Sequence, residues 1–230
     1  MPDQAALLHT LNEQIVACRK CPRLVEYRER VAKEKRRAFR EHAYWGKPVP
    51  GFGDSKAKLF ILGLAPAAHG GNRTGRVFTG DRSGDFLFAA LYAAGFANQP
   101  TSVNREDGLR LKNAYIAAAA RCAPPDNKPL PSELLNCRPY LLRELEILQP
   151  KAVLALGKIA WDAYLTILKE QGTISSRAAF AFAHGAEANL PNGVRLFGVY
   201  HPSQQNTQTG RVTPAMYAKV LRRIQKFLSS

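Results

Sequence analysis

The stretch that decides the fold is "KLFILGL" (residues 58–64), which runs directly into "APAAHGGNRTGRVFTGD" (residues 65–81). A short, apolar run is typical of a strand that is buried on both faces of a parallel sheet. The polar, glycine-rich continuation is typical of a loop whose backbone approaches a ligand closely. Together they predict a buried strand that ends at a binding site.

The same pattern continues along the chain, where apolar runs alternate with helical patterns. The expected strands are 58–64, 113–122, 151–157 and 194–200, and the expected helices are 3–16, 83–96, 131–148, 158–170 and 213–228. This alternation predicts an α/β fold with a parallel sheet covered on both faces. Ser83, Ser132 and Thr213 are the expected N-caps, and Pro139 is expected to kink or split its helix. The loop 44–54, rich in Pro and Gly, is expected to be irregular.

Ligand sites in such sheets lie beyond the carboxyl ends of the strands. Three polar loops follow strands there: 65–81, "CAPPDN" (122–127) and "HPSQQNTQTGR" (201–211). The topology therefore predicts that the three loops cluster at one rim of the sheet. The first loop matches neither the P-loop spacing nor the dinucleotide fingerprint, which argues against a nucleotide cofactor.

Three side chains at this rim have two interpretations each. Phe78 is either a stacking platform for a base or a core residue. Asp81 is either a catalytic acid or the cap of the following helix. His201 either donates a hydrogen bond to an anionic group or serves packing.

The charge of the chain points to a polyanion. The 230 residues carry 33 Lys and Arg against 18 Asp and Glu, a formal net charge of +15. This excess favours nucleic acid as the partner, and the alternative is a basic protein that charge merely keeps in solution. The basic segment "YRERVAKEKRRAFR" (residues 27–40) is equally well a solvated helix face or a flank that contacts phosphates.

The sequence shows no secretory or membrane-spanning pattern. The first residues, "MPDQAALLHTLNEQ", hold no basic segment followed by an apolar one, and the longest apolar run, 86–97, is too short to span a bilayer. We therefore expect a cytoplasmic protein with no membrane contact.

In the cytoplasm, the Cys18–Cys21 pair favours a metal site or a redox function over a disulfide. With Cys122 and Cys137, the spacing leaves zinc, an iron–sulfur cluster and four unrelated buried thiols open.

Several ordered motifs carry a family resemblance that covers about residues 18–211. They are "CRKCPRL", "VPGFGD", "GLAPAAHGGNRTGRVFTGD", "RCAPPDNKP" and "HPSQQNTQTGR". The chain resembles the iron–sulfur branch of the uracil-DNA glycosylases, specifically family 5, whose first motif contains Leu. The resemblance implies a three-layer α/β/α sandwich with a central four-stranded parallel sheet. It also implies one domain over residues 1–230, whose N-terminal arm (1–50) is clamped by a 4Fe–4S cluster on Cys18, Cys21, Cys122 and Cys137.

The resemblance also assigns roles to individual residues. The implied base pocket is Gly63, Leu64, Ala65, Phe78 and Ala118, and the implied catalytic residues are Asp81, Asn127 and His201. Leu64 and Ala118 stand where related enzymes carry polar side chains, which implies a roomier pocket. His201 matches the residue that bonds uracil O2, and Phe78 the aromatic that stacks on the base. The side chains expected to contact DNA are Arg73, Arg76, Ser203, Gln205, Asn206 and Arg211.

The implied activity is hydrolysis of the N-glycosidic bond of uracil, and of other deaminated bases such as hypoxanthine, in double-stranded DNA. The damaged base must be flipped out of the duplex for this chemistry, which would initiate base excision repair. No lysine is placed as an obvious Schiff-base nucleophile, so we expect a monofunctional glycosylase that does not cleave the strand. We also expect a monomer. Two other classes remain open: a non-catalytic nucleic-acid-binding module with a zinc clamp, and an iron–sulfur electron-transfer protein.

Overall fold

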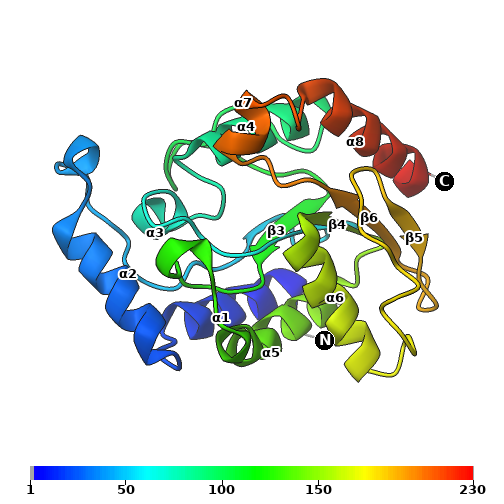
Figure 1. Ribbon diagram of the computed structural model, residues 1–230, viewed down its shortest axis with the longest axis horizontal. Coiled ribbons are helices and arrows are strands. Elements are labelled where there is room, and N and C mark those ends of the chain that lie inside the picture. The colour runs from blue at the N-terminus through cyan, green and yellow to red at the C-terminus, as the bar shows by residue number, and fades with distance from the viewer. Residues whose placement is uncertain (1–2, 230) are drawn as a thin grey trace.

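The computed structural model describes residues 3–229 and is built around one mixed sheet with the strand order β1-β3-β2-β4-β6-β5 (Figure 1). The strands are β1 (Phe52–Gly53), β2 (Leu59–Gly63), β3 (Ala114–Ala118), β4 (Ala152–Leu156), β5 (Glu187–Asn189) and β6 (Arg195–Val199). The four central strands are parallel, which confirms the predicted arrangement. The strand containing "LFILG" lies inside this group, between β3 and β4.

The two edge strands were not expected. β1 lies in the loop 44–54 that we predicted to be irregular, and Phe52 there pairs antiparallel with Ile116 of β3. β5 pairs antiparallel with β6 at the opposite edge. Strands of two and three residues are too short to show a periodicity, so their pairing is decided by the neighbouring strand.

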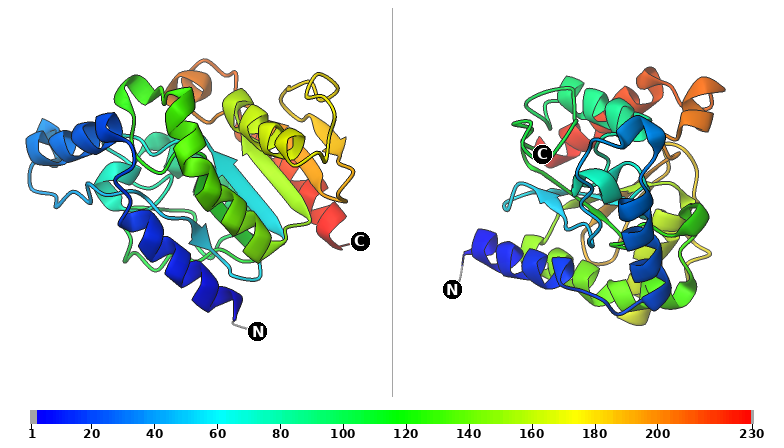
Figure 2. Two further views of the ribbon diagram at one scale, coloured as in Figure 1. Left: turned by 90° about the horizontal axis from the view of Figure 1, so that it is seen from below. Right: turned by 90° about the vertical axis from the view of Figure 1, so that its left-hand side faces the viewer.

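Helices cover both faces of the sheet, as the sequence predicts (Figures 1 and 2). Leu59 and Ile61 of β2 pack in a core with α4 (Arg82–Ala93) and α8 (Pro214–Ser229). Phe60 and Leu62 point the other way and belong to the core shared with three other helices. Those helices are α1 (Gln4–Val16), α5 (Pro131–Leu148) and α6 (Lys158–Glu170). Successive side chains of a strand alternate between faces, so one apolar run supplies both layers of the sandwich.

The predicted helix ends agree with the structure only in part. Thr213 caps α8, because Thr213 Oγ1 accepts a hydrogen bond from Met216 N at 3.3 Å. Asp81 and not Ser83 caps α4, and Ser132 lies within α5, which begins at Pro131. Pro139 does not split α5. The side chains of Cys137 and Leu141, on either side of Pro139, are both buried, so tertiary packing holds the helix together across the proline.

The part of the N-terminal arm that follows α1 lies beside one end of the sheet. It contains α2 (Pro22–Glu34) and a short 3₁₀ turn (Arg37–Phe39), which extend from the sandwich at the left of Figure 1. The arm contacts the short helix α3 (Gly71–Thr74), where Asn72 Nδ2 donates to Arg28 O at 3.2 Å. Over residues 3–229, no helix combines the length and the apolar character that a membrane span requires.

Candidate active site

A cavity of about 1060 Å³ opens at the carboxyl ends of the four parallel strands. Leu64 follows β2, Ala118 ends β3, Leu156 ends β4 and His201 follows β6, and all four line this strand-end cavity. Because the chain leaves β2 toward β3 on one side and reaches β4 on the other, the cavity lies at a topological switch point of the sheet. The predicted clustering of the three polar loops is therefore confirmed.

Phe78 and His201 form one wall of the strand-end cavity. Their ring centroids are 5.8 Å apart. A Cβ atom at Gly63 would lie 2.7 Å from Phe78 Cε2, so only glycine at the end of β2 lets the ring sit there. Phe78 has a φ of 50°, a left-handed conformation that a bulky residue rarely adopts. Such backbone strain persists where the surrounding structure fixes a functional side chain.

His201 is held as a neutral imidazole. Burial lowers the pKa of His201 to about 4. Within residues 3–229, no group hydrogen-bonds the His201 ring nitrogens, so a ring N–H is available to a ligand in the cavity. A neutral imidazole donor is suited to stabilising negative charge that develops on a bound group.

Asp81 caps the following helix and also lies at the wall of the strand-end cavity, so both interpretations of the sequence, helix cap and catalytic acid, fit its position. Asp81 Oδ1 accepts a hydrogen bond from Gly84 N at 2.9 Å, which confirms the helix cap. The same carboxylate lines the strand-end cavity, and a Cβ atom at Gly70 would overlap Asp81 Oδ2. Burial raises the pKa of Asp81, while the backbone N–H groups of Gly84 and Ser83 oppose this shift. A partly desolvated carboxylate at a cavity wall is a candidate for acid–base or electrostatic catalysis.

Asn127 also reaches the strand-end cavity, from the loop after β3. Asn127 and its neighbour Asp126 have φ values of 57° and 53°, so two consecutive residues are left-handed. Asn and Asp tolerate this conformation better than most residues. The sequence analysis selected Asn127 and missed Asp126, although both line the cavity.

Other cavity residues escaped the sequence analysis. Among them are Tyr27, Arg36, Phe39, His69, Asp85, Lys158 and Ile159. Tyr27, Arg36 and Phe39 belong to the basic segment 27–40, which therefore forms a wall of the cavity as well as a solvated face. The only signal for it was the density of positive charge, which does not distinguish the two roles. Lys158 Nζ pairs with Asp162 Oδ2 at 2.5 Å and its side chain is exposed.

Arg73 and Arg76 do not have the surface position that phosphate contacts require. Both are buried. Arg76 Nη2 pairs with Asp107 Oδ2 at 2.6 Å and donates to Ser102 Oγ at 2.9 Å. Arg73 Nε donates to His69 O at 2.8 Å, and Arg73 Nη2 donates to Gly80 O at 2.7 Å. The structure corrects the expectation: these guanidinium groups brace the loop that carries Phe78 and Asp81.

The loop after His201 has both internal and exposed polar side chains. Ser203 Oγ accepts from Asn206 N at 3.2 Å, and Asn206 Nδ2 donates to His201 O at 2.9 Å. These two bonds order the loop and the short helix α7 (Gln204–Gln208). Gln205 and Arg211 are exposed, and the Arg211 guanidinium lies 4.9 Å from the centroid of the Tyr200 ring.

The four cysteines approach one another where the arm meets the sandwich. Cys21, Leu24 and Cys122 form a small buried cluster. Burial raises the pKa of Cys122 to about 12, the Arg28 guanidinium opposes this shift, and the thiols of Cys137 and Cys18 add to it. Burial likewise raises the pKa of Cys137, and the thiols of Cys21 and Cys18 add to the shift.

This cysteine group is not arranged as a finished metal site. In the part of the chain that the structure describes, no group of three or more His, Cys, Asp or Glu side chains has metal-site geometry. Arg28 Nη1 donates to Cys122 Sγ at 2.9 Å, and Asn136 Nδ2 donates to Cys21 Sγ at 3.4 Å. The donor set is nevertheless all-thiol, which suits zinc or an iron–sulfur cluster equally.

Comparison with known proteins gives a consistent result. The family model described as the uracil DNA glycosylase superfamily matches residues 50–225. A type-5 uracil-DNA glycosylase from Mycobacterium bovis is 53% identical over 94% of this chain and 80% of its own length. One from Thermus thermophilus is 49% identical over 95% of each chain. A type-4 uracil-DNA glycosylase from Pyrobaculum aerophilum is only 30% identical, over 85% of this chain and 83% of its own.

Proposed function

The chain belongs to the type-5 branch of the uracil-DNA glycosylase superfamily, and from this membership we propose that it hydrolyses the N-glycosidic bond of uracil in DNA. Release of the base would initiate base excision repair. The observation that carries the proposal is the strand-end cavity, where Phe78, Asp81, Asn127 and His201 line one space at the switch point of the sheet.

Binding of the base is the first step. A base inside a duplex is out of reach, so it must be flipped out, at a cost of a few kcal/mol. The Phe78 ring provides the face on which the flipped base stacks. His201, neutral because burial lowers its pKa, donates a hydrogen bond to a uracil oxygen. Negative charge develops on that oxygen as the glycosidic bond breaks. The hydrogen bond from His201 to this oxygen is therefore stronger in the transition state than in the bound substrate.

The sugar side of the reaction falls to Asp81 and Asn127. Positive charge develops on the sugar, and an ionised carboxylate at the cavity wall stabilises it and orients the attacking water. Asp81 is the predicted source of this charge, and Gly70, which has no side chain, leaves room for its oxygen. Asn127 is proposed to assist from the facing loop. Hydrolysis by water gives an abasic site with the DNA strand intact.

We propose that the base pocket accepts deaminated bases larger than uracil, such as hypoxanthine. Leu64 and Ala118 offer the base no polar side chain, and Ala118 is small. A pocket with few hydrogen-bonding groups rejects an altered base weakly, because no buried polar group is left unpaired.

We propose further that Cys18, Cys21, Cys122 and Cys137 hold a 4Fe–4S cluster. The all-thiol donor set fits this group, and the buried Arg28 guanidinium beside Cys122 supplies positive charge against the thiolates. When bound, the cluster supplies a structural clamp between the N-terminal arm and the segment after β3. A cytoplasmic location fits four reduced thiols. We also propose that the protein acts as a monomer.

Iron analysis and thermal unfolding test the cluster together. Purified protein is expected to contain about four irons and to absorb broadly in the visible range. Cys122→Ser is expected to lose iron and to lower the Tm, because the arm is no longer clamped. Stoichiometric zinc without iron would contradict the cluster and leave a zinc clamp.

Single-turnover excision tests the activity itself. The protein is incubated in excess with a duplex that contains one uracil, and free base and abasic sites are measured separately. We expect uracil release with no strand break before alkali treatment. A binding module without catalysis would retain the duplex and release no base, and that result would contradict the proposal.

A further inference from the structure

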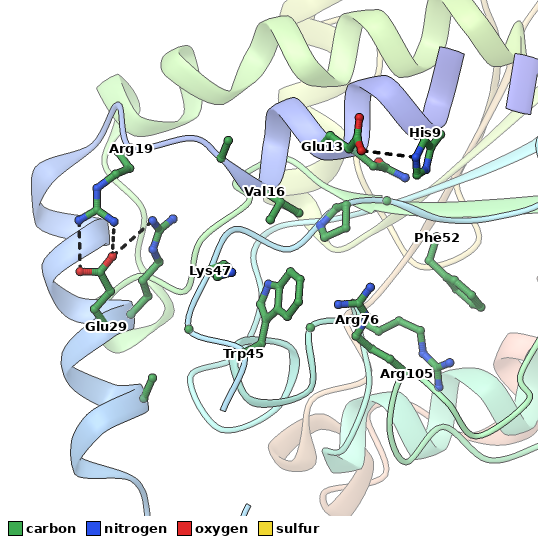
Figure 3. A pocket seen from close by; sticks show the side chains of 18 residues that line it. His9, Glu13, Val16, Arg19, Glu29, Trp45, Lys47, Phe52, Arg76 and Arg105 are labelled. Carbon is green, nitrogen blue, oxygen red and sulfur yellow. Dashed lines mark hydrogen bonds and ion pairs between the residues drawn. The ribbon is translucent and has the colours of Figure 1, made fainter. Parts of the chain in front are cut away.

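A second cavity, of about 940 Å³, lies between the helices α1 and α2 and the loop that contains Trp45 (Figure 3). The lining includes Arg19, Arg28, Trp45, Lys47, Arg76 and Arg105. We call this cavity the Trp45 cleft. α2 separates the two cavities, since Tyr27 lines the strand-end cavity while Glu29 and Ala32 line the Trp45 cleft. Nothing in the proposed reaction uses it.

An aromatic ring flanked by two cations forms one wall of the Trp45 cleft. The Arg105 guanidinium lies 4.3 Å from the centroid of the Trp45 ring, and Lys47 Nζ lies 5.5 Å from it. A Cβ atom at Gly75 would lie 2.9 Å from Trp45 Cδ2 and 2.8 Å from Arg105 Cδ. The bare glycine therefore lets the ring and the guanidinium close over the turn at residue 75.

The acidic side chains of the Trp45 cleft have basic partners, whereas two of its basic side chains have no acidic partner among the described residues. Glu29 is held by Arg19 at 2.5 and 3.2 Å, and Glu13 lies 3.5 Å from His9 (Figure 3). Within residues 3–229, neither Lys47 nor Arg105 has a carboxylate within ion-pair distance, and both are exposed. The positive charge of this wall is thus available to a ligand.

A half-buried tryptophan beside two unpaired cations matches the chemistry of a nucleotide. Aromatic rings bind unpaired bases by stacking, and lysine and arginine bind the phosphates. We propose that the Trp45 cleft binds a nucleotide of single-stranded DNA, with its base on Trp45 and its phosphate at Lys47 and Arg105.

The Trp45 cleft adjoins the strand-end cavity through one short segment of chain. Gly75 and Arg76 line the cleft, and the next two residues, Val77 and Phe78, line the strand-end cavity. A nucleotide in the cleft therefore rests against the segment that carries Phe78. This second site goes beyond the proposed excision of uracil and does not depend on it.

Tryptophan fluorescence tests the site directly, because the chain has two tryptophans. Trp161 is buried, with Nε1 donating to Phe180 O at 3.0 Å, so a ligand reaches only Trp45. The probe is undamaged oligothymidylate of about eight nucleotides, within the site size of small single-strand binders. We expect saturable quenching by the oligonucleotide and none by inorganic polyphosphate. Because the probe holds no uracil, the result is independent of glycosylase activity.

A pair of double variants locates the contact. Lys47→Ala with Arg105→Ala is expected to weaken oligothymidylate binding about tenfold and to flatten the salt dependence by about 0.7 per lost cation. Arg110→Ala with Lys112→Ala removes two exposed cations that line neither cavity, and is expected to change binding less than twofold. Equal losses in both variants, quenching by polyphosphate, or no quenching by the oligonucleotide would each overturn the proposal.

Discussion

The Asp81 carboxylate packs directly against the bare Cα of Gly70, where any Cβ atom would overlap Asp81 Oδ2. Gly70→Ala is therefore expected to push the carboxylate out of place while keeping its charge. A displacement of about 1 Å costs up to roughly 10²-fold in rate, so single-turnover release of uracil should fall at least tenfold.

A double variant, Gly70→Ala combined with Asp81→Asn, tests whether Gly70 acts through the Asp81 carboxylate. If Gly70 acts through the carboxylate, then Gly70→Ala should add little to the loss already caused by Asp81→Asn, because the two changes affect one group. Independent, additive losses would show that Gly70 serves the backbone of the loop instead.

Asp81→Asn by itself separates catalysis from capping. Asparagine caps helices about as well as aspartate, so the Tm should change little and the side chain at position 81 should still accept the hydrogen bond from Gly84 N. Excision should nevertheless fall by about 10²-fold or more, the scale on which a general base is lost. Near wild-type excision would move the catalytic assignment to Asn127 and His201.

His201 is expected to make stability pH-dependent in a defined direction. Its pKa is about 4 in the folded chain and about 6.5 when unfolded. Between these values the unfolded chain binds the extra proton, so the contribution of His201 is complete above about pH 6.5 and is lost as the pH falls toward 4. Denaturant unfolding of the wild type and His201→Gln at about pH 7.5 and about pH 5 measures this.

The variant provides the reference, since glutamine does not titrate. The wild type should lose more free energy of unfolding than His201→Gln between the two pH values. Equal losses would mean that His201 is not held neutral by burial.

Arg76 is expected to be a stability residue and not a phosphate contact. Arg76→Ala would remove the ion-pair partner of the half-buried Asp107, which keeps its hydrogen bonds from backbone N–H groups. Loss of a hydrogen bond to a charged group typically lowers the free energy of unfolding by about 1.5–3 kcal/mol. Arg76 and backbone N–H groups lower the pKa of Asp107 to about 2 despite its burial. The stability that this carboxylate contributes is therefore present above about pH 3.9 and is lost as the pH falls toward 2.

Arg211→Ala is the matched comparison for DNA binding. Arg211 is exposed, so its removal should leave the Tm nearly unchanged. If it contacts a phosphate, the slope of log K against log salt should become shallower by about 0.9. Arg76→Ala, measured where it remains folded, should leave that slope unchanged.

Ala118→Asn is expected to narrow the range of bases. Ala118 lies at the end of β3, is buried and lines the strand-end cavity. An asparagine there would fill space and introduce a polar group that a wrong base leaves unpaired, a strong basis for rejection. Release of hypoxanthine should fall more than release of uracil in single-turnover assays. Equal losses for the two bases would argue that Ala118 does not determine the range of bases accepted.

Local pattern was sufficient to predict the centre of the fold and the position of the strand-end cavity. Uniformly apolar runs such as 58–64 have one stable environment, a sheet covered on both faces, and parallel strands place their following loops at one rim. The clustering of loops 65–81, 122–127 and 201–211 was thus predictable from the order of the elements. The helix boundaries of α5 and α6 were also predicted, because hydrophobic periodicity acts over a few residues, although the expected cap Ser132 was wrong.

Only the tertiary structure decided what depends on distant partners. The edge strand β1 exists because Phe52 meets Ile116, and Arg76 is buried because Asp107 comes to it from another loop. In the sequence, both arginines of the first loop looked the same as exposed cations. The walls contributed by Tyr27, Phe39 and Trp45 depend on how the arm packs against the sandwich. Burial and long-range pairing are properties of the folded chain, and no local pattern contains them.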